Sequence, residues 1–217
     1  MKLSIKSIGI AYTISLFMLY TSCNNENKNT NDNTRSTNQT GSDQVETENP
    51  TSSENLTSSK EFDINSIPVS DQVLGDFPFF SLPEGLTEQN KPVQRKFDRL
   101  FFPIEGTMTP LEGNVWKSNI IMERGNTDDW SLPYFEKSYD EAIRAAGGVK
   151  IFDGEISKEE YDRYHSQAAY LGEDGSIGYA GQNIKVYAIH REDSGDIFIQ
   201  LAGYSAGGYV NVLQKEH

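Results

Sequence analysis

The stretch Ser131-Leu-Pro-Tyr-Phe-Glu-Lys-Ser-Tyr-Asp-Glu-Ala-Ile-Arg-Ala-Ala146-Gly-Gly-Val-Lys-Ile-Phe152 decides the fold class of this chain. Its apolar residues recur at steps of three and four positions, which is the spacing of one helix face. They are Leu132, Phe135, Tyr139, Ile143 and Ala146. Two glycines then stop the pattern, and the last four residues have the composition of a short strand. The sequence therefore predicts a helix over residues 131–146, followed at once by a strand over 149–152.

The apolar stripe of this helix is expected to lie against a sheet. Phe135, Tyr139 and Ile143 should be buried, whereas Lys137 and Arg144 should point into water. An amphipathic helix next to a strand is typical of a domain that packs helices on a sheet.

Four more strands are predicted, over residues 115–122, 184–190, 197–202 and 209–213. Turn residues separate the last three at 192–195 and 203–208. This order predicts an α+β domain with two helices packed on one face of a mostly antiparallel sheet. The proline-bearing residues 67–86 are expected to form an irregular arm over the core.

A second helix is predicted to begin after Ile156. Ser157 can cap the amide of Glu160, Glu160 can reach back, and Ile156 can pack on Tyr161. These four positions make a capping box with a hydrophobic staple.

Composition excludes several classes of protein. The 217 residues suffice for one ordinary domain with attachments, and the formal net charge is −13. An acidic chain is a poor partner for phosphate backbones, so no nucleic-acid partner is expected. One cysteine and three histidines leave no material for a disulfide framework or a cysteine-rich metal site, so no metal and no cofactor are expected.

The N-terminus has the organisation of a secretory signal. Lys2 and Lys6 supply positive charge, Ile8–Tyr20 supplies an apolar core, and Ser22 precedes Cys23. The apolar stretch is shorter than the roughly 20 residues that span a membrane comfortably. A soluble secreted protein and a membrane-spanning protein are the alternatives.

This segment resembles a bacterial lipoprotein signal, in which a small residue precedes the cysteine that receives lipid. Tyr20 departs from the Leu or Ala usual three positions upstream of that cysteine, but Bacteroidetes-type lipoproteins carry looser motifs. The resemblance implies a signal peptide over 1–22 and lipidation of Cys23. Acyl chains on Cys23 would hold the protein to the membrane.

Residues 24–60 are dominated by Asn, Ser, Thr and Glu, with Val45 and Leu56 as their aliphatic residues. Such a composition cannot bury enough apolar surface to offset the entropy of ordering the chain. Residues 23–60 are therefore expected to be a lipidated cysteine with a disordered tether, and 61–217 a single folded domain.

The sharpest catalytic pattern is Gly203-Tyr-Ser205-Ala-Gly207, which matches G-x-S-x-G. A nucleophile elbow needs a helix after the serine, and then an acid and a histidine later in the chain. A strand is predicted to follow, and His217 and Glu216 are the only later partners. A glycine-rich turn chosen for backbone freedom is the favoured interpretation, and no catalytic residue is expected.

Three other patterns have plainer explanations. Asp153–Glu159 has oxygen donors at alternate positions but lacks the glycine and glutamate of a calcium loop. Asp128-Asp129 and Glu159-Glu160 are adjacent carboxylates that do not face each other, and they suit helix N-termini. His165 and His190 fall on different predicted elements and are expected to be ordinary surface or edge residues.

Residues from about 67 to 214 resemble the N-terminal region found in many OmpA-family envelope proteins. The resemblance rests on the blocks 75–84, 97–103, 134–139, 151–161 and 177–182. In those longer proteins an OmpA-like domain that grips peptidoglycan follows, and the present chain ends at His217, so peptidoglycan contact is not expected. The resemblance implies placement in the envelope and a non-enzymatic accessory role.

The predicted function is therefore that of a lipid-anchored envelope protein, at the outer membrane, which acts as a structural or interaction module for an envelope partner. A small-ligand or glycan binder that uses exposed aromatic side chains is the alternative. A hydrolase that depends on Ser205 is a third, less favoured reading.

Overall fold

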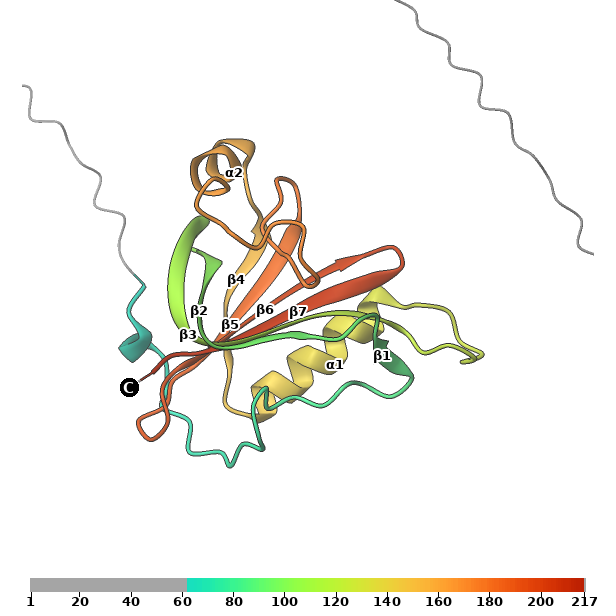
Figure 1. Cartoon of the computed structure of the whole chain (residues 1–217). Helices are drawn as coiled ribbons and strands as arrows, with labels where there is room; N and C mark the ends of the chain where they lie inside the picture. The colour runs from blue at the N-terminus through green and yellow to red at the C-terminus, as the bar shows by residue number, and fades with distance from the viewer. Residues whose placement is uncertain (1–61, 217) are drawn as a thin grey trace, which may run out of the picture. The chain divides into compact units, whose positions relative to one another are not determined.

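The computed structural model describes residues 62–216 (Figure 1). The predicted signal peptide (1–22), the lipidated Cys23 and the tether (23–60) lie outside the described residues. Within them, seven strands and two helices follow a short 3-10 helix. Their order is η1 (Ile64–Ser66), β1 (Leu86–Glu88), β2 (Val93–Ile104), β3 (Thr107–Met122), α1 (Leu132–Ala145), β4 (Val149–Glu155), α2 (Lys158–Tyr164), β5 (Asn183–Ile189), β6 (Ile197–Tyr204) and β7 (Gly207–Gln214).

The strands form one antiparallel sheet in the order β1-β3-β7-β6-β5-β4, and β2 also pairs with β3. The long strand β3 pairs with β2 along its first part and with β7 from Asn114 to Ile120. The three strands predicted to close the chain are β5, β6 and β7. The predicted α+β class, with two helices on an antiparallel sheet, is confirmed.

Helix α1 forms where the periodic pattern predicts it. The Ser131 hydroxyl caps the helix by accepting a hydrogen bond from the Tyr134 amide at 3.3 Å, and Gly147 ends it with a φ of 83°. Phe135, Tyr139 and Ile143 are buried, as predicted. The Lys137 side chain is 73% exposed and pairs with Glu141, so the polar side of the helix faces water.

The two helices do not pack on one face of the sheet, and that prediction is wrong. Helix α1 packs on a core built by one face, here called the α1 face, which includes Tyr187, Ile199 and Val212. Tyr164 of α2 belongs to the core on the other face, with Val186 and others. This second face is called the hairpin face, because the β2–β3 hairpin curls across it.

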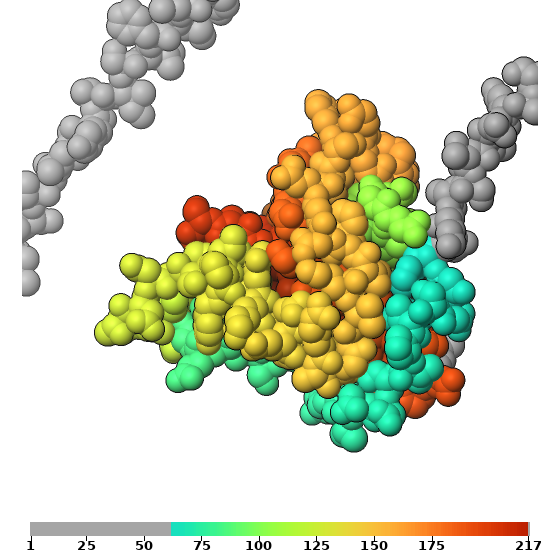
Figure 2. All heavy atoms as spheres, turned by 180° about the vertical axis from the view of Figure 1, so that it is seen from behind, coloured from blue at the N-terminus to red at the C-terminus, as the bar shows by residue number. Residues whose placement is uncertain are grey.

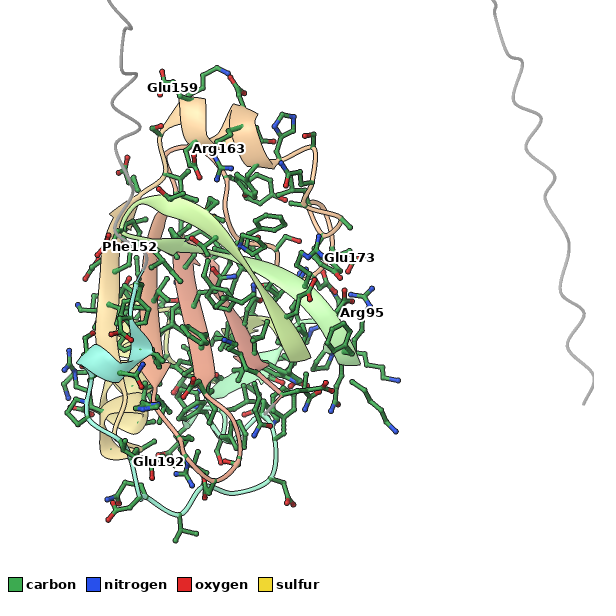
Figure 3. All side chains as sticks on the ribbon, turned by 90° about the vertical axis from the view of Figure 1, so that its left-hand side faces the viewer. Arg95, Phe152, Glu159, Arg163, Glu173 and Glu192 are labelled. Carbon is green, nitrogen blue, oxygen red and sulfur yellow. The ribbon has the colours of Figure 1, made fainter. Side chains whose placement is uncertain are left out.

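The hairpin is the main element that the sequence did not predict. Strand β2 and the first half of β3 turn at Glu105-Gly106, and β2 contacts β4 and β5 on the far side of the sheet. Figure 3 shows the hairpin crossing in front of the other strands. A shift of register between Arg95 and Asp98 marks a bulge in β2. The curl encloses the second core.

Helix α2 is tied to the curled hairpin. The Ser157 hydroxyl accepts from the Glu160 amide at 3.1 Å, which confirms the predicted cap. Glu160 does not reach back to complete the capping box, because its carboxylate accepts from the amide of Met108 in β3. Arg163 donates to the Met108 carbonyl at 3.0 Å from the same helix.

The glycines of the turn between β6 and β7 make room for α1. A Cβ on Gly203 would lie 1.9 Å from Leu132 Cδ1, and one on Gly208 would lie 2.6 Å from the Phe135 ring. The expected turn is present, but close approach of the helix, rather than backbone freedom, is the reason for these two glycines.

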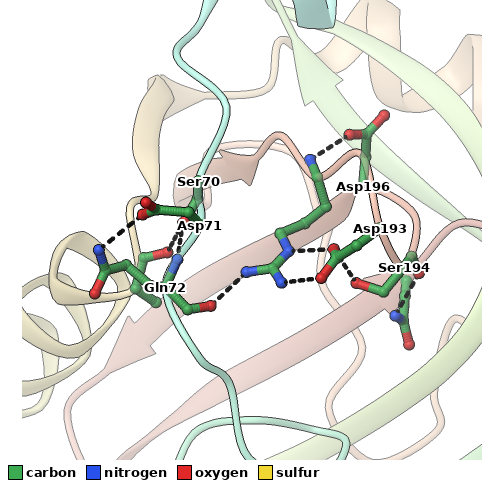
Figure 4. Close-up of polar contacts among 9 residues, drawn as sticks. Ser70, Asp71, Gln72, Asp193, Ser194 and Asp196 are labelled. Carbon is green, nitrogen blue, oxygen red and sulfur yellow. Dashed lines mark hydrogen bonds and ion pairs between the residues drawn. The ribbon is translucent and has the colours of Figure 1, made fainter.

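The irregular arm over residues 67–85 covers one end of the α1 face. The Ser70 hydroxyl donates to the Ala146 carbonyl at 2.8 Å, and the Ser70 amide donates to the His190 backbone carbonyl at 2.9 Å. The Arg191 guanidinium, which is mostly buried, donates to the Gln72 carbonyl and pairs with Asp193 at 2.6 Å (Figure 4). In the view from behind, α1 and the chain that follows it form much of the surface (Figure 2).

Candidate functional site

A row of three polar side chains crosses the centre of the hairpin face. Lys117 of β3 is the cross-strand partner of Asn211 in β7, and Asn211 is the partner of Gln200 in β6. Side chains at directly opposed positions lie on the same face of a sheet and within contact of one another. Lys117 is 0% exposed, and the other two are 1% exposed. The row is therefore a polar strip inside an otherwise apolar core.

The Lys117 ammonium lacks a close counter-ion among the described residues. Its Nζ lies 3.3 Å from the Ser176 hydroxyl oxygen and 4.7 Å from the centre of the Tyr170 ring. Burial lowers the pKa of Lys117 from 10.5 to about 8, and the more distant Glu173 carboxylate offsets part of this effect. A buried lysine with this pKa gains or loses its proton at mildly alkaline pH.

The side-chain amides of Gln200 and Asn211 each have an oxygen that accepts no hydrogen bond from residues 62–216. These two oxygens, Gln200 Oε1 and Asn211 Oδ1, are buried. Both residues, with Lys117, line a cavity of about 20 Å³. That is the room of about one water molecule or one hydroxyl group. The cavity is thus lined by one residue with a cationic donor and by two residues whose amide oxygens have no partner among residues 62–216.

An irregular segment over residues 165–182, here called the cover segment, closes this cavity. Its Gly175 has a φ of +76°, and a Cβ there would lie 2.7 Å from the Ser118 amide nitrogen and 3.1 Å from Asn211 Oδ1. Only glycine lets the backbone approach the strands this closely. The Tyr164 hydroxyl of α2 donates to the Gly178 carbonyl and holds the segment from the other side.

Arg95 of β2 clamps the cover segment from outside. Its guanidinium pairs with Glu173 at 3.3 Å and lies 5.0 Å from the centre of the Tyr170 ring. Arg95 and Glu173 point toward each other at the side of the hairpin in Figure 3. The Tyr170 ring is therefore in contact with two cations, Arg95 and Lys117, each in a cation–π interaction. Tyr170 separates the buried lysine from the surface.

A surface groove of about 290 Å³ lies next to this partition. It is lined by Phe97, Asp98, Arg99, Phe101, Glu112, Gln167, Ala169 and Tyr170. Phe101 and Tyr170 line both the groove and the Lys117 cavity, so the two spaces share a wall. Phe97 stands at the β2 bulge and is 58% exposed.

The charges around the groove are paired. Arg99 Nε donates to Glu112 Oε1 at 2.8 Å, and Arg95 Nε lies 3.2 Å from Asp98 Oδ2. Aromatic rings, an amide and neutralised charges are a set of groups that suits an uncharged ligand better than an ionic one. The arrangement can bind a small uncharged molecule, and the Tyr170 ring stands between the groove and a polar cavity.

The serine of the G-x-S-x-G pattern lines neither the cavity nor the groove. Ser205 and Ala206 form the exposed two-residue turn between β6 and β7. A strand follows the serine, as predicted, so the strand–helix context of a nucleophile elbow is missing from this turn.

The carboxylates and histidines singled out in the sequence are dispersed. Asp153 pairs with Lys150 at 2.6 Å, and His165 stacks on Tyr161. His190 Nδ1 lies 2.8 Å from Asp196, which helps to hold the arm. Within residues 62–216, the structure has no group of three or more His, Cys, Asp or Glu side chains placed to hold a metal ion.

The paired carboxylates have separate positions. Glu159 and Glu160 occupy the first turn of α2, as predicted. Asp128 and Asp129 are exposed in the loop before α1 rather than in its first turn, and with Tyr134 they line another surface groove.

Comparison with known proteins gave no match among family models, curated proteins or solved structures. The resemblance to the OmpA-associated region therefore stays a prediction. Among residues 62–216, no helix is long and apolar enough to cross a membrane.

The polar row was not predicted from the sequence, although the sequence contains a signal for it. Lys117, Gln200 and Asn211 are polar residues inside three strands that are otherwise rich in apolar residues. The three strands are neighbours in the sheet, and the three polar residues lie on the same face of it. Polar residues that share one face of adjacent strands would have indicated a polar site.

Proposed function

We propose that this chain is a lipid-anchored protein of the bacterial cell envelope, held at the outer membrane by acyl chains on Cys23, and that its folded domain is a non-enzymatic interaction module. The anchor is supported by the pattern of residues 1–22 with Ser22 before the cysteine. The module is supported by one observation, the groove beside the β2 bulge with the exposed Phe97 at its rim. Exposed aromatic side chains beside a hollow are typical of contact surfaces.

Fractionation tests the anchor. Cys23→Ala should leave an unprocessed precursor or release the protein from membranes, since acyl chains are what would hold it there. A variant of mature size that still fractionates wholly with membranes would refute the lipid anchor.

Photo-crosslinking in intact cells tests the module. A photoreactive amino acid at Phe97 should give a discrete adduct of defined mass. The same residue at Val73, which is 98% exposed on the arm, is the matched control and should not give that adduct. Equal adducts from both positions would show that position 97 has no special contact.

A second candidate function is the binding of a small ligand or a glycan. This is the alternative to the interaction module that the sequence suggested. The polar row at Lys117 favours it, because Gln200 and Asn211 line a cavity and each carries a buried oxygen without a partner among residues 62–216. Nearly all buried polar atoms in natural proteins have a hydrogen-bond partner. Two buried acceptors without one are therefore suited to accept hydrogen bonds from a bound ligand.

A further inference from the structure

The chemistry of the Lys117 cavity selects the kind of group that fits it. The ammonium of Lys117 can only donate, and the side-chain oxygens of Gln200 and Asn211 can only accept. An anion would satisfy the lysine but oppose both oxygens, and a cation would oppose the lysine. A neutral oxygen that both donates and accepts fits all three, which means a water molecule or a hydroxyl group.

The groove outside the shared wall fits the same class of ligand. It offers the rings of Phe97, Phe101 and Tyr170, and its Arg99 and Glu112 are paired with each other. Apolar ring faces next to neutralised charges suit a molecule with a C–H face and many hydroxyl groups. Its volume of about 290 Å³ is of the size of small-ligand sites.

The wall between the two spaces is formed in part by a segment without regular secondary structure. Tyr170 belongs to the cover segment, which has no helix or strand of its own between α2 and β5. The outer clamp is the exposed ion pair of Arg95 with Glu173, and such pairs contribute little to stability. A shift of the Tyr170 ring would join the groove to the cavity.

We propose that the groove binds a neutral saccharide, and that one of its hydroxyl groups enters the cavity to accept a hydrogen bond from Lys117 and donate to Gln200 or Asn211. This inference rests on the second candidate function, the binding of a small ligand. Tyr170 then acts as both the gate of the cavity and a stacking surface for the sugar ring.

Saturation-transfer NMR on the full chain, in a detergent without a sugar head group, tests the inference. The probes are D-glucose, D-galactose and N-acetyl-D-glucosamine, with acetate and phosphate as anionic probes. At least one saccharide should bind, and the anions should not. Its affinity should fall about tenfold or more in Lys117→Met and also fall in Phe97→Ala. Val73→Ala is the matched control and should bind as the unaltered chain does.

A second readout reports on the cavity itself. In protein labelled with ¹⁵N-lysine, the Lys117 Nζ resonance is identified by its loss in Lys117→Met, and it should shift on addition of the saccharide. If Lys117→Met fails to fold, Gln200→Leu removes an acceptor from the same cavity and should weaken binding.

The outcomes separate the two proposals. Binding that weakens in Phe97→Ala but not in the cavity variants would overturn the entry of a hydroxyl into the cavity and leave a groove ligand. Binding of the anions in place of the saccharides, or of none of the probes, would overturn the saccharide. None of these results decides the crosslinking at position 97, which tests the interaction module separately.

Discussion

The α1 face of the sheet packs apolar side chains almost throughout, with Ser118 as its buried polar exception, whereas the hairpin face carries Lys117, Asn211 and Gln200 at its centre. Helix α1 covers the first face with a regular stripe. The hairpin, α2 and the cover segment close the second with irregular turns. The difference indicates that the α1 face stabilises the domain and that the hairpin face gives up stability for a polar interior.

Burial of the Lys117 ammonium is the main reason why the polar interior of the hairpin face lowers the stability of the domain. Taking an ammonium out of water without a carboxylate partner is unfavourable, and the contacts with Ser176 and Tyr170 offset only part of it. The buried Arg191 near the arm differs from Lys117, because its guanidinium donates hydrogen bonds to the Asp193 carboxylate and the Gln72 carbonyl. Two mostly buried cations in one domain are therefore expected to have opposite effects on stability.

The largest expected effect lies on the α1 face. Phe135→Ala should lower the free energy of unfolding by about 3–5 kcal/mol, because the ring is 0% exposed and its removal leaves a cavity. Lys137→Ala on the exposed side of the same helix should cause no measurable change. Denaturant titrations of both variants measure this. If the lysine variant were the more damaging, the stripe of α1 would not be the core face.

On the hairpin face, Lys117→Met should stabilise the protein near neutral pH. The pKa of Lys117 is lowered from 10.5 in water to about 8 in the fold, so between these values the unfolded chain binds more protons. The stability of the unaltered protein therefore rises with pH across that window. Relative to Lys117→Met it should gain up to about 3 kcal/mol, at about 1.4 kcal/mol per pKa unit.

Unfolding titrations of the two proteins at about pH 7 and above pH 10.5 measure this difference. Comparison with the methionine variant removes the contribution of the tyrosines, which titrate in the same range. A difference that does not change with pH would mean that the lysine is not desolvated in the fold.

Arg191→Met should destabilise the protein, whereas Lys117→Met should stabilise it. The variant loses the hydrogen bond to the Gln72 carbonyl and loosens the arm, with an expected loss of about 2 kcal/mol. Denaturant titration at about pH 7, beside Lys117→Met, gives the comparison. Stabilisation by both substitutions would show that burial alone, and not the presence of partners, decides the effect of a cation here.

The smallest effect is expected at the outer clamp. Arg95→Ala should change the global stability by less than about 1 kcal/mol, since both side chains of its pair with Glu173 are 37% exposed. Hydrogen exchange should nevertheless become faster over residues 170–176. Tyr170→Phe keeps the ring and is the control. Unchanged exchange in Arg95→Ala would mean that the clamp does not hold the cover segment.

The α1 face was within reach of the sequence because its signals are local. The stripe of α1, its Ser131 cap and the Gly147 stop all lie within 17 residues of one another along the chain. The three C-terminal strands were likewise marked by apolar runs between turn residues. Local periodicity and capping were sufficient to predict the α+β class.

The hairpin face could not be predicted in the same way. The bulge between Arg95 and Asp98 breaks the alternation of β2, and Pro103 and Pro110 in the paired strands argue against a sheet. The burial of Lys117 depends on Tyr170 and Ser176, more than 50 residues away along the chain. A lysine in a strand is usually exposed, and only the curl of the hairpin with the cover segment reverses that expectation.

Lys117 is held out of water inside the hairpin face, and titration of its own Nζ is the sharpest check of this. In ¹⁵N-lysine-labelled protein, with Lys117 assigned by its loss in Lys117→Met, the Nζ shift is followed as the pH is raised. The structure predicts a midpoint near 8, separated from those of the exposed lysines. A midpoint near the ordinary value of 10.5 would contradict the account, because it would show that the amine reaches water.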